Sequence, residues 1–182
     1  FIDCDIPTRS TDAHSTLILN NHNSSEMRED GLIGRGITTI KSARYEEQGH
    51  ILFDGEHDGY VQPYEYLHKR LIYINDSGED IRGEDIVMHQ HSSENGDTLQ
   101  FIIRFQLHPN VSVTEGREEE SLTLGLAGGE VWQFRHRGGA LSIEDSRYFG
   151  DGGKASATKQ IVLCSQTEGA VTPTLWSLIL ER

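Results

Sequence analysis

Short runs of alternating apolar and polar residues, separated by glycine-rich turns, recur along the whole chain. In the clearest run, 99–108, the side chains of Phe101, Ile103, Phe105 and Leu107 would share one face of a strand, opposite a mostly polar face. Similar runs follow one another at roughly ten-residue spacing, and no stretch shows a sustained helical period. The pattern therefore predicts an all-β chain of about a dozen short strands.

The expected strands form one two-layer antiparallel β-sandwich, jelly-roll-like, in a single domain over residues 1–182. Six large apolar side chains are expected between the two layers: Phe101, Phe105, Trp132, Phe134, Ile161 and Trp176. The strands are expected at 1–7, 14–19, 37–48, 50–53, 66–75, 81–86, 99–108, 111–114, 122–126, 131–136, 141–148, 158–165 and 175–180. The polar segment 20–36 between two of them is expected to be a loop.

Composition narrows the functional classes. The chain has 182 residues, a formal net charge of -13 and 35% hydrophobic residues, which excludes a basic nucleic-acid binder. No run approaches the roughly 18 apolar residues of a membrane-spanning helix, so no membrane partner is expected. Two cysteines are too few for a disulfide scaffold. Periplasmic and cytoplasmic locations both stay open.

The block from residue 57 to residue 85 carries more polar groups than a plain core strand needs. His57, Tyr60 and His68 could serve as base and acid in a proton abstraction. The alternative is structural: Tyr60 ties two strands together, and the two histidines bond to nearby carbonyl groups.

Four further charged residues of this block lie on neighbouring expected strands. A set of this kind predicts cross-strand ion pairs with a structural role. Its members are Arg70, Arg82, Glu84 and Asp85.

One candidate metal site lies near the start of the chain. His14 begins an expected strand, and Asp3 belongs to the strand before it. A histidine and an aspartate on neighbouring strands could bind zinc, provided that a third ligand comes from elsewhere. The alternative is that His14 simply contacts solvent at a strand end.

Several residue strings, in this order, resemble the C-terminal β-domain of bacterial heparinase II/III-like proteins, a polysaccharide lyase superfamily. Each string alone is a weak signal, but the ordered set covers nearly the whole chain. The strings include RSTDAHSTLIL (9–19), HDGY (57–60), RGED (82–85), IRFQLHP (103–109), EVWQFR (130–135) and LSIEDSRYFG (141–150).

The resemblance implies a β-sandwich that packs against an α/α toroid, with the substrate cleft between them. In the family's enzymes, uronic-acid polysaccharides are cleaved by β-elimination, and the toroid, absent from these residues, supplies the catalytic tyrosine and asparagine. A structural zinc occurs in some members. His14 matches a metal-ligand histidine, and Asp3 is a looser match to a metal-ligand aspartate.

Two departures count against lyase activity in these residues alone. Gln106 stands where the family usually has histidine, and a charge of -13 repels an acidic polysaccharide. We therefore expect the β-sandwich part of a lyase that is inactive alone, with His57, Tyr60 and His68 as the residues to test.

Other functions stay open beside this one. The chain could be a non-catalytic carbohydrate-binding or assembly module, or a folded remnant without a ligand. Sugar binding by such a module would use exposed aromatic residues, for which Tyr64, Tyr66 and Tyr148 are the candidates. An exposed sheet edge could also pair two copies in a homo-oligomer.

Overall fold

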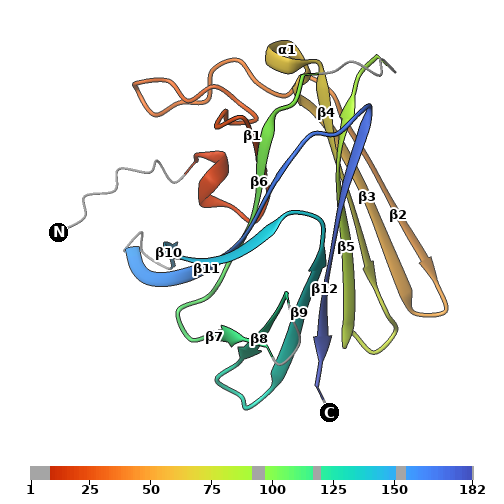
Figure 1. Cartoon of the computed structure of the whole chain (residues 1–182), viewed down its shortest axis with the longest axis vertical. Helices are drawn as coiled ribbons and strands as arrows, with labels where there is room; N and C mark the ends of the chain where they lie inside the picture. Colours follow the sequence, from red (N-terminus) through yellow and green to blue (C-terminus); the bar gives the residue numbers. More distant parts are fainter. Residues whose placement is uncertain (1–8, 92–96, 117–119, 151–154, 182) are drawn as a thin grey trace.

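Two antiparallel sheets lie face to face in the computed structural model, which describes residues 9–91, 97–116, 120–150 and 155–181 (Figure 1). The smaller sheet has four strands in the order β1-β6-β11-β10. The larger sheet has eight, in the order β2-β3-β4-β5-β12-β9-β8-β7. The predicted two-layer β-sandwich of about a dozen strands is thus confirmed.

The elements follow the predicted runs closely. In chain order they are η1 (Thr11–Ala13), β1 (Leu17–Leu19), β2 (Ile40–Glu47), β3 (His50–Tyr60), α1 (Val61–Tyr64), β4 (Tyr66–Ile74), β5 (Asp80–His89), β6 (Gln100–Gln106), β7 (Ser112–Glu115), β8 (Ser121–Gly125), β9 (Val131–Arg137), β10 (Ala140–Phe149), β11 (Ala155–Gln166) and β12 (Val171–Leu180). Within the described residues, no helix is long and apolar enough to cross a membrane.

Strands β3 and β5 are longer than predicted, and both extend through polar residues. Strand β3 continues from Phe53 to Tyr60, and its pairing with β4 shifts register between His57 and Tyr60. These strands extend because their backbone groups form hydrogen bonds with the neighbouring strand, and this pairing does not depend on apolar side chains. The strand expected at 1–7 lies outside the described residues.

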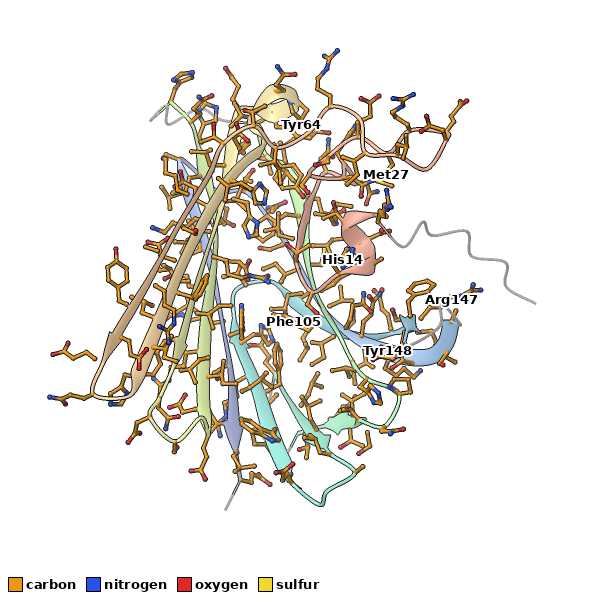
Figure 2. All side chains as sticks on the ribbon, turned by 180° about the vertical axis from the view of Figure 1, so that it is seen from behind. His14, Met27, Tyr64, Phe105, Arg147 and Tyr148 are labelled. Carbon is orange, nitrogen blue, oxygen red and sulfur yellow. The ribbon has the colours of Figure 1, made fainter. Side chains whose placement is uncertain are left out.

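The aromatic core lies where the sequence placed it, between the sheets (Figure 2). The ring of Phe105, from the smaller sheet, meets Phe134 and Trp176, from the larger one, at centroid distances of 5.2 and 5.0 Å. Phe101, Phe134, Ile161 and Trp176 are buried, whereas Phe105 and Trp132 are half-buried against them. Edge-to-face packing of this kind stabilises the contact between the layers beyond the burial of area.

One glycine makes room for the largest of these side chains. Gly83 of β5 lies opposite Trp176 of β12, and a Cβ atom at Gly83 would stand 2.0 Å from Cζ2 of the indole ring. The ring therefore occupies the space that any other residue at position 83 would need. The Gly in the string RGED is explained by this packing.

Candidate functional site

Each residue of the string HDGY, at the end of β3, contacts a different part of the chain. The Asp58 carboxylate accepts hydrogen bonds from the backbone N–H of Thr38, at 2.9 Å, and from its hydroxyl group. A Cβ atom at Gly59 would stand 2.6 Å from the carbonyl oxygen of Ser24, so the loop 20–36 can approach the backbone here only because residue 59 is glycine.

Tyr60 closes the string. Its side chain is 1% exposed, and its hydroxyl group donates to the carbonyl oxygen of Leu17 in β1 at 2.7 Å. Burial raises the pKa of Tyr60, so the phenol stays protonated. The geometry is that of the structural alternative, in which Tyr60 ties one strand to another.

His57 and His68 belong to a chain of hydrogen bonds that begins at the backbone of Gly59, where the register between β3 and β4 shifts. The N–H of Gly59 donates to Nδ1 of His57 at 3.2 Å, so that nitrogen carries no proton. Nε2 of His57 therefore bears the proton and donates to Nδ1 of His68, also at 3.2 Å. Nε2 of His68 then donates to the carboxylate of Asp85 at 2.7 Å. Both histidines are neutral in this arrangement, and both nitrogen atoms of each ring are bonded.

The structural alternative for the two histidines needs a correction. Their ring nitrogens bond to each other, to Asp85 and to a backbone N–H, and not to carbonyl groups. Burial is the main cause that lowers the pKa of His57 to about 4, and the positive charge of Arg70 acts in the same direction. At neutral pH the His57 imidazole is thus uncharged.

Asp85 is the centre of this network and is completely buried. Besides His68, its carboxylate accepts from Nε and Nη2 of Arg70, at 2.8 and 3.0 Å, and from Nε1 of Trp176 at 2.9 Å. Burial alone would raise the pKa of Asp85, but the hydrogen bond from His68 and the charge of Arg70 outweigh it and lower the pKa. Nη1 of Arg70 also donates to the carbonyl oxygen of Ser15 at 2.6 Å, which links β4 to the segment just before β1.

Only half of the predicted ion-pair set lies in this network. Arg70 pairs with Asp85 across β4 and β5 as expected. Arg82 instead pairs with Asp80, at 2.8 Å, two residues away on its own strand. The reason is the alternation of β5, which turns residues 82 and 84 to the opposite face from residue 85.

The candidate metal ligands are only partly within the described residues. His14 is exposed at the end of η1, and Asp3 lies outside the described residues. The described part of the chain brings no three histidine, cysteine, aspartate or glutamate side chains together in a metal-binding group. Zinc at His14 therefore stays a prediction.

The three candidate sugar-binding tyrosines do not form one surface. Tyr66 is 1% exposed and donates to the carbonyl oxygen of Asp97, so the expectation that it is exposed is wrong. Tyr64 and Tyr148 are half-buried and lie far apart, Tyr64 at the top of Figure 2 and Tyr148 lower down at one side. The ring of Tyr148 packs against His108 at a centroid distance of 4.8 Å, and the hydroxyl group of Tyr64 bonds to Nδ1 of His22.

A polar cleft of about 770 Å³ lies between the loop 20–36 and the HDGY end of β3. The lining consists largely of amide, hydroxyl and charged side chains; among them are Asn23, Ser24, Glu26, Arg35, Thr38 and Asp58. Groups of these types can hydrogen-bond the hydroxyl groups of a polar ligand. No pattern in the sequence indicated this cleft, because it depends on how the loop 20–36 folds back over β3.

Comparison with known proteins supports the resemblance in the sequence. The profile of the family described as heparinase II/III-like, C-terminal, matches residues 7–176. FtsZ-localized protein C of Caulobacter vibrioides is 27% identical over 141 residues, which cover 75% of this chain and 24% of that protein.

Solved structures share the fold. Heparan sulfate lyase HepC from Pedobacter heparinus matches 94% of this chain with a TM-score of 0.72 at 15% identity, and heparinase III matches 96% with a TM-score of 0.68 at 14% identity. In each case the match covers 24% of the other chain. The chain thus spans about a quarter of the length of the relatives that it matches.

Proposed function

Because the chain belongs to the heparinase II/III-like C-terminal family, we propose that it is the β-sandwich part of a larger, lyase-type protein and carries none of the acid–base groups itself. In that protein it forms one wall of the cleft that binds an acidic polysaccharide. Cleavage of the uronic-acid chain by β-elimination then depends on residues of the remaining three quarters of the molecule.

One observation carries this proposal: every polar atom of the three candidate catalytic side chains is already bonded within the sandwich. Tyr60 donates to Leu17, and both ring nitrogens of His57 and of His68 have partners. A base in β-elimination must approach the C5 hydrogen of a uronate with an available lone pair. None of the three offers one without breaking the network that joins the two sheets.

The polar cleft supports the role of a wall. Its amide and hydroxyl groups suit sugar hydroxyls, but Glu26 and Asp58 on the same surface repel a polyanion. Cations from another part of the protein are therefore needed for an acidic glycan to bind there.

The test compares the isolated chain with the intact protein on uronic-acid polysaccharides, with the ultraviolet absorbance of the unsaturated uronate product as readout. We expect no product from the chain alone and product from the intact protein. In the intact protein, Tyr60→Phe and His68→Gln should lower the melting temperature and leave kcat of the folded enzyme unchanged. Product from the isolated chain, or loss of kcat at unchanged stability, would contradict the proposal.

A non-catalytic assembly role is the second candidate. It is favoured by FtsZ-localized protein C, whose 27% identity exceeds the 14–15% of the two lyase structures. Under this alternative, the intact protein gives no unsaturated product and sediments together with FtsZ polymers. Lyase product without co-sedimentation would rule the alternative out.

A further inference from the structure

Strand β2 forms one edge of the eight-stranded sheet. It pairs with β3 on one side, and no other strand of the described residues pairs with its other side. Seven of its eight residues are exposed. A long exposed edge presents a row of backbone donors and acceptors that can pair with another strand.

Two observations determine which backbone groups face outward. The N–H of Asp58 donates to the carbonyl oxygen of Thr39, at 3.3 Å, so the backbone groups of Thr39 face β3. The two-residue turn Gln48–Gly49, with φ angles of 50° and 84°, is closed by Glu47 and His50, the position of a hydrogen-bonded pair. Odd-numbered residues of β2 therefore bond to β3, and the N–H and C=O groups of Ser42, Arg44 and Glu46 face outward.

Large apolar side chains gather on both faces of this edge. On one face Tyr45 is 59% exposed and lies opposite Leu52 of β3, which is 37% exposed. On the other face Ile40 is 70% exposed and Phe53 of β3 is 47% exposed. An added strand would cover part of this apolar surface while it satisfied the backbone groups.

The charges of β2 identify the partner strand that fits. Its first half carries Lys41 and Arg44, and its second half carries Glu46 and Glu47. An antiparallel copy of the same strand places each positive half opposite a negative half. Because the local charge cancels, the edge can approach a second copy although each chain carries a net charge of -13.

We propose that β2 pairs antiparallel with β2 of a second copy, about a two-fold axis at Tyr45, so that the two larger sheets become continuous. Directly opposed residues in an antiparallel pair share a face, so the two-fold axis must pass midway between the two copies of one and the same residue. An axis at Arg44 would oppose two arginines, whereas an axis at Tyr45 opposes the two tyrosines and places each Arg44 opposite Glu46 of the other copy. Strand pairing of this length buries less surface than a permanent dimer needs, so association is concentration-dependent.

The first experiment is sedimentation of the chain over a concentration series from about 5 to 500 μM, a range suited to a small interface. We expect a shift from monomer to dimer, with weaker association for Arg44→Glu and for Glu46→Arg by about tenfold each, as for like charges placed directly opposite. The double charge swap, Arg44→Glu with Glu46→Arg, should restore the parent affinity. Circular dichroism and melting confirm that each variant is folded.

The second experiment tests the position of the axis. Tyr45→Cys should form an inter-copy disulfide under mild oxidation, because directly opposed residues at the axis lie within disulfide distance. Two controls are used. The first is Lys41→Cys, whose residue lies opposite the turn of the other copy, and the second is the parent chain with its own two cysteines. A chain that stays monomeric throughout overturns the proposal, as does a dimer indifferent to the charge variants or cross-linked at residue 41. Capture of β2 by an extended segment of a different protein would appear as the monomeric outcome.

Discussion

Gly83, in the string RGED, shows how the residue type at one position can be determined by its partner on the neighbouring strand. We predict that Gly83→Ala destabilises the fold by about 3 kcal/mol, the upper part of the range for overpacked cores. The new Cβ atom would stand 2.0 Å from the Trp176 ring, and moving the ring would break its 2.9 Å hydrogen bond to Asp85. Urea unfolding followed by tryptophan fluorescence measures the change.

Gly55→Ala is the matched control for this prediction. Gly55 is also an interior strand residue of the larger sheet, but its nearest contact for an added Cβ atom is the Arg70 carbonyl oxygen at 3.9 Å. We expect a change of no more than about 0.5–1 kcal/mol, in the stabilising direction, because alanine restricts the unfolded chain. Equal effects of the two substitutions would show that the indole ring does not need the space at Gly83.

His57 should make stability depend on pH. Its pKa in the folded chain is lowered from 6.5 to about 4, so between these values the unfolded chain binds a proton that the folded chain does not. The free energy of unfolding therefore falls as the pH drops from 6.5 towards 4, by up to about 3 kcal/mol. The main cause is burial, which disfavours the charged imidazolium, and a proton on Nδ1 would also face the N–H of Gly59.

The substitution His57→Gln tests this dependence, since glutamine can bond both neighbours without titrating. Unfolding in urea at pH 7, 6 and 5 should give a shallower loss of stability for the variant than for the parent. The variant His14→Gln, at an exposed histidine, serves as the control. A parent slope that His57→Gln leaves unchanged would assign the pH dependence to other groups.

At the scale of elements, the loop 20–36 and the end of β3 depend on each other. We predict that Asp58→Ala speeds amide hydrogen exchange in residues 37–39 and in the adjoining loop by about tenfold, the effect of losing a charge-assisted hydrogen bond. Asp58 accepts from both the backbone and the side chain of Thr38, and these bonds lower its pKa to about 2 although burial acts to raise it. Core strands such as β6 and β11 should keep their protection.

Glu56→Ala provides the comparison for the loop. Glu56 lies two residues earlier on β3 and pairs with Lys41 of β2 at 2.7 Å, an exposed pair with a small expected effect. Exchange in the loop should then match that of the parent. If both variants speed hydrogen exchange in the loop equally, the loop is held in place by the pairing of β2 with β3 and not by Asp58.

Most strands were predictable from sequence because alternation specifies them, apart from the polar ends of β3 and β5. The run 99–108 contains β6, and Phe101, Ile103 and Phe105 point into the core as predicted. The bonds among His57, His68 and Asp85 were not predictable. They depend on the register of three strands that the sequence does not fix, and on the bulge in β3 after His57.

At the scale of the whole molecule, the distribution of charge separates the interior from the surface. Inside, Arg70, His68 and Trp176 surround the carboxylate of Asp85. Over the whole sequence, 29 acidic residues outnumber 16 basic ones, which gives the net charge of -13, and Asp85 is the only buried carboxylate among the described residues. The interior pair is shielded from salt, whereas repulsion among the surface carboxylates is not.

This asymmetry predicts that salt stabilises the protein. Raising NaCl from about 10 to 200 mM, which shortens the Debye length to less than 10 Å, should raise the melting temperature by about 2–4 °C. The triple variant Glu29→Gln, Glu47→Gln and Glu115→Gln removes three exposed carboxylates and should show a smaller rise. A melting temperature that falls with salt would mean that exposed ion pairs such as Lys159–Asp145 contribute more than the net repulsion. Low protein concentration keeps the measurement independent of β2 pairing, because dimer formation would itself raise the melting temperature.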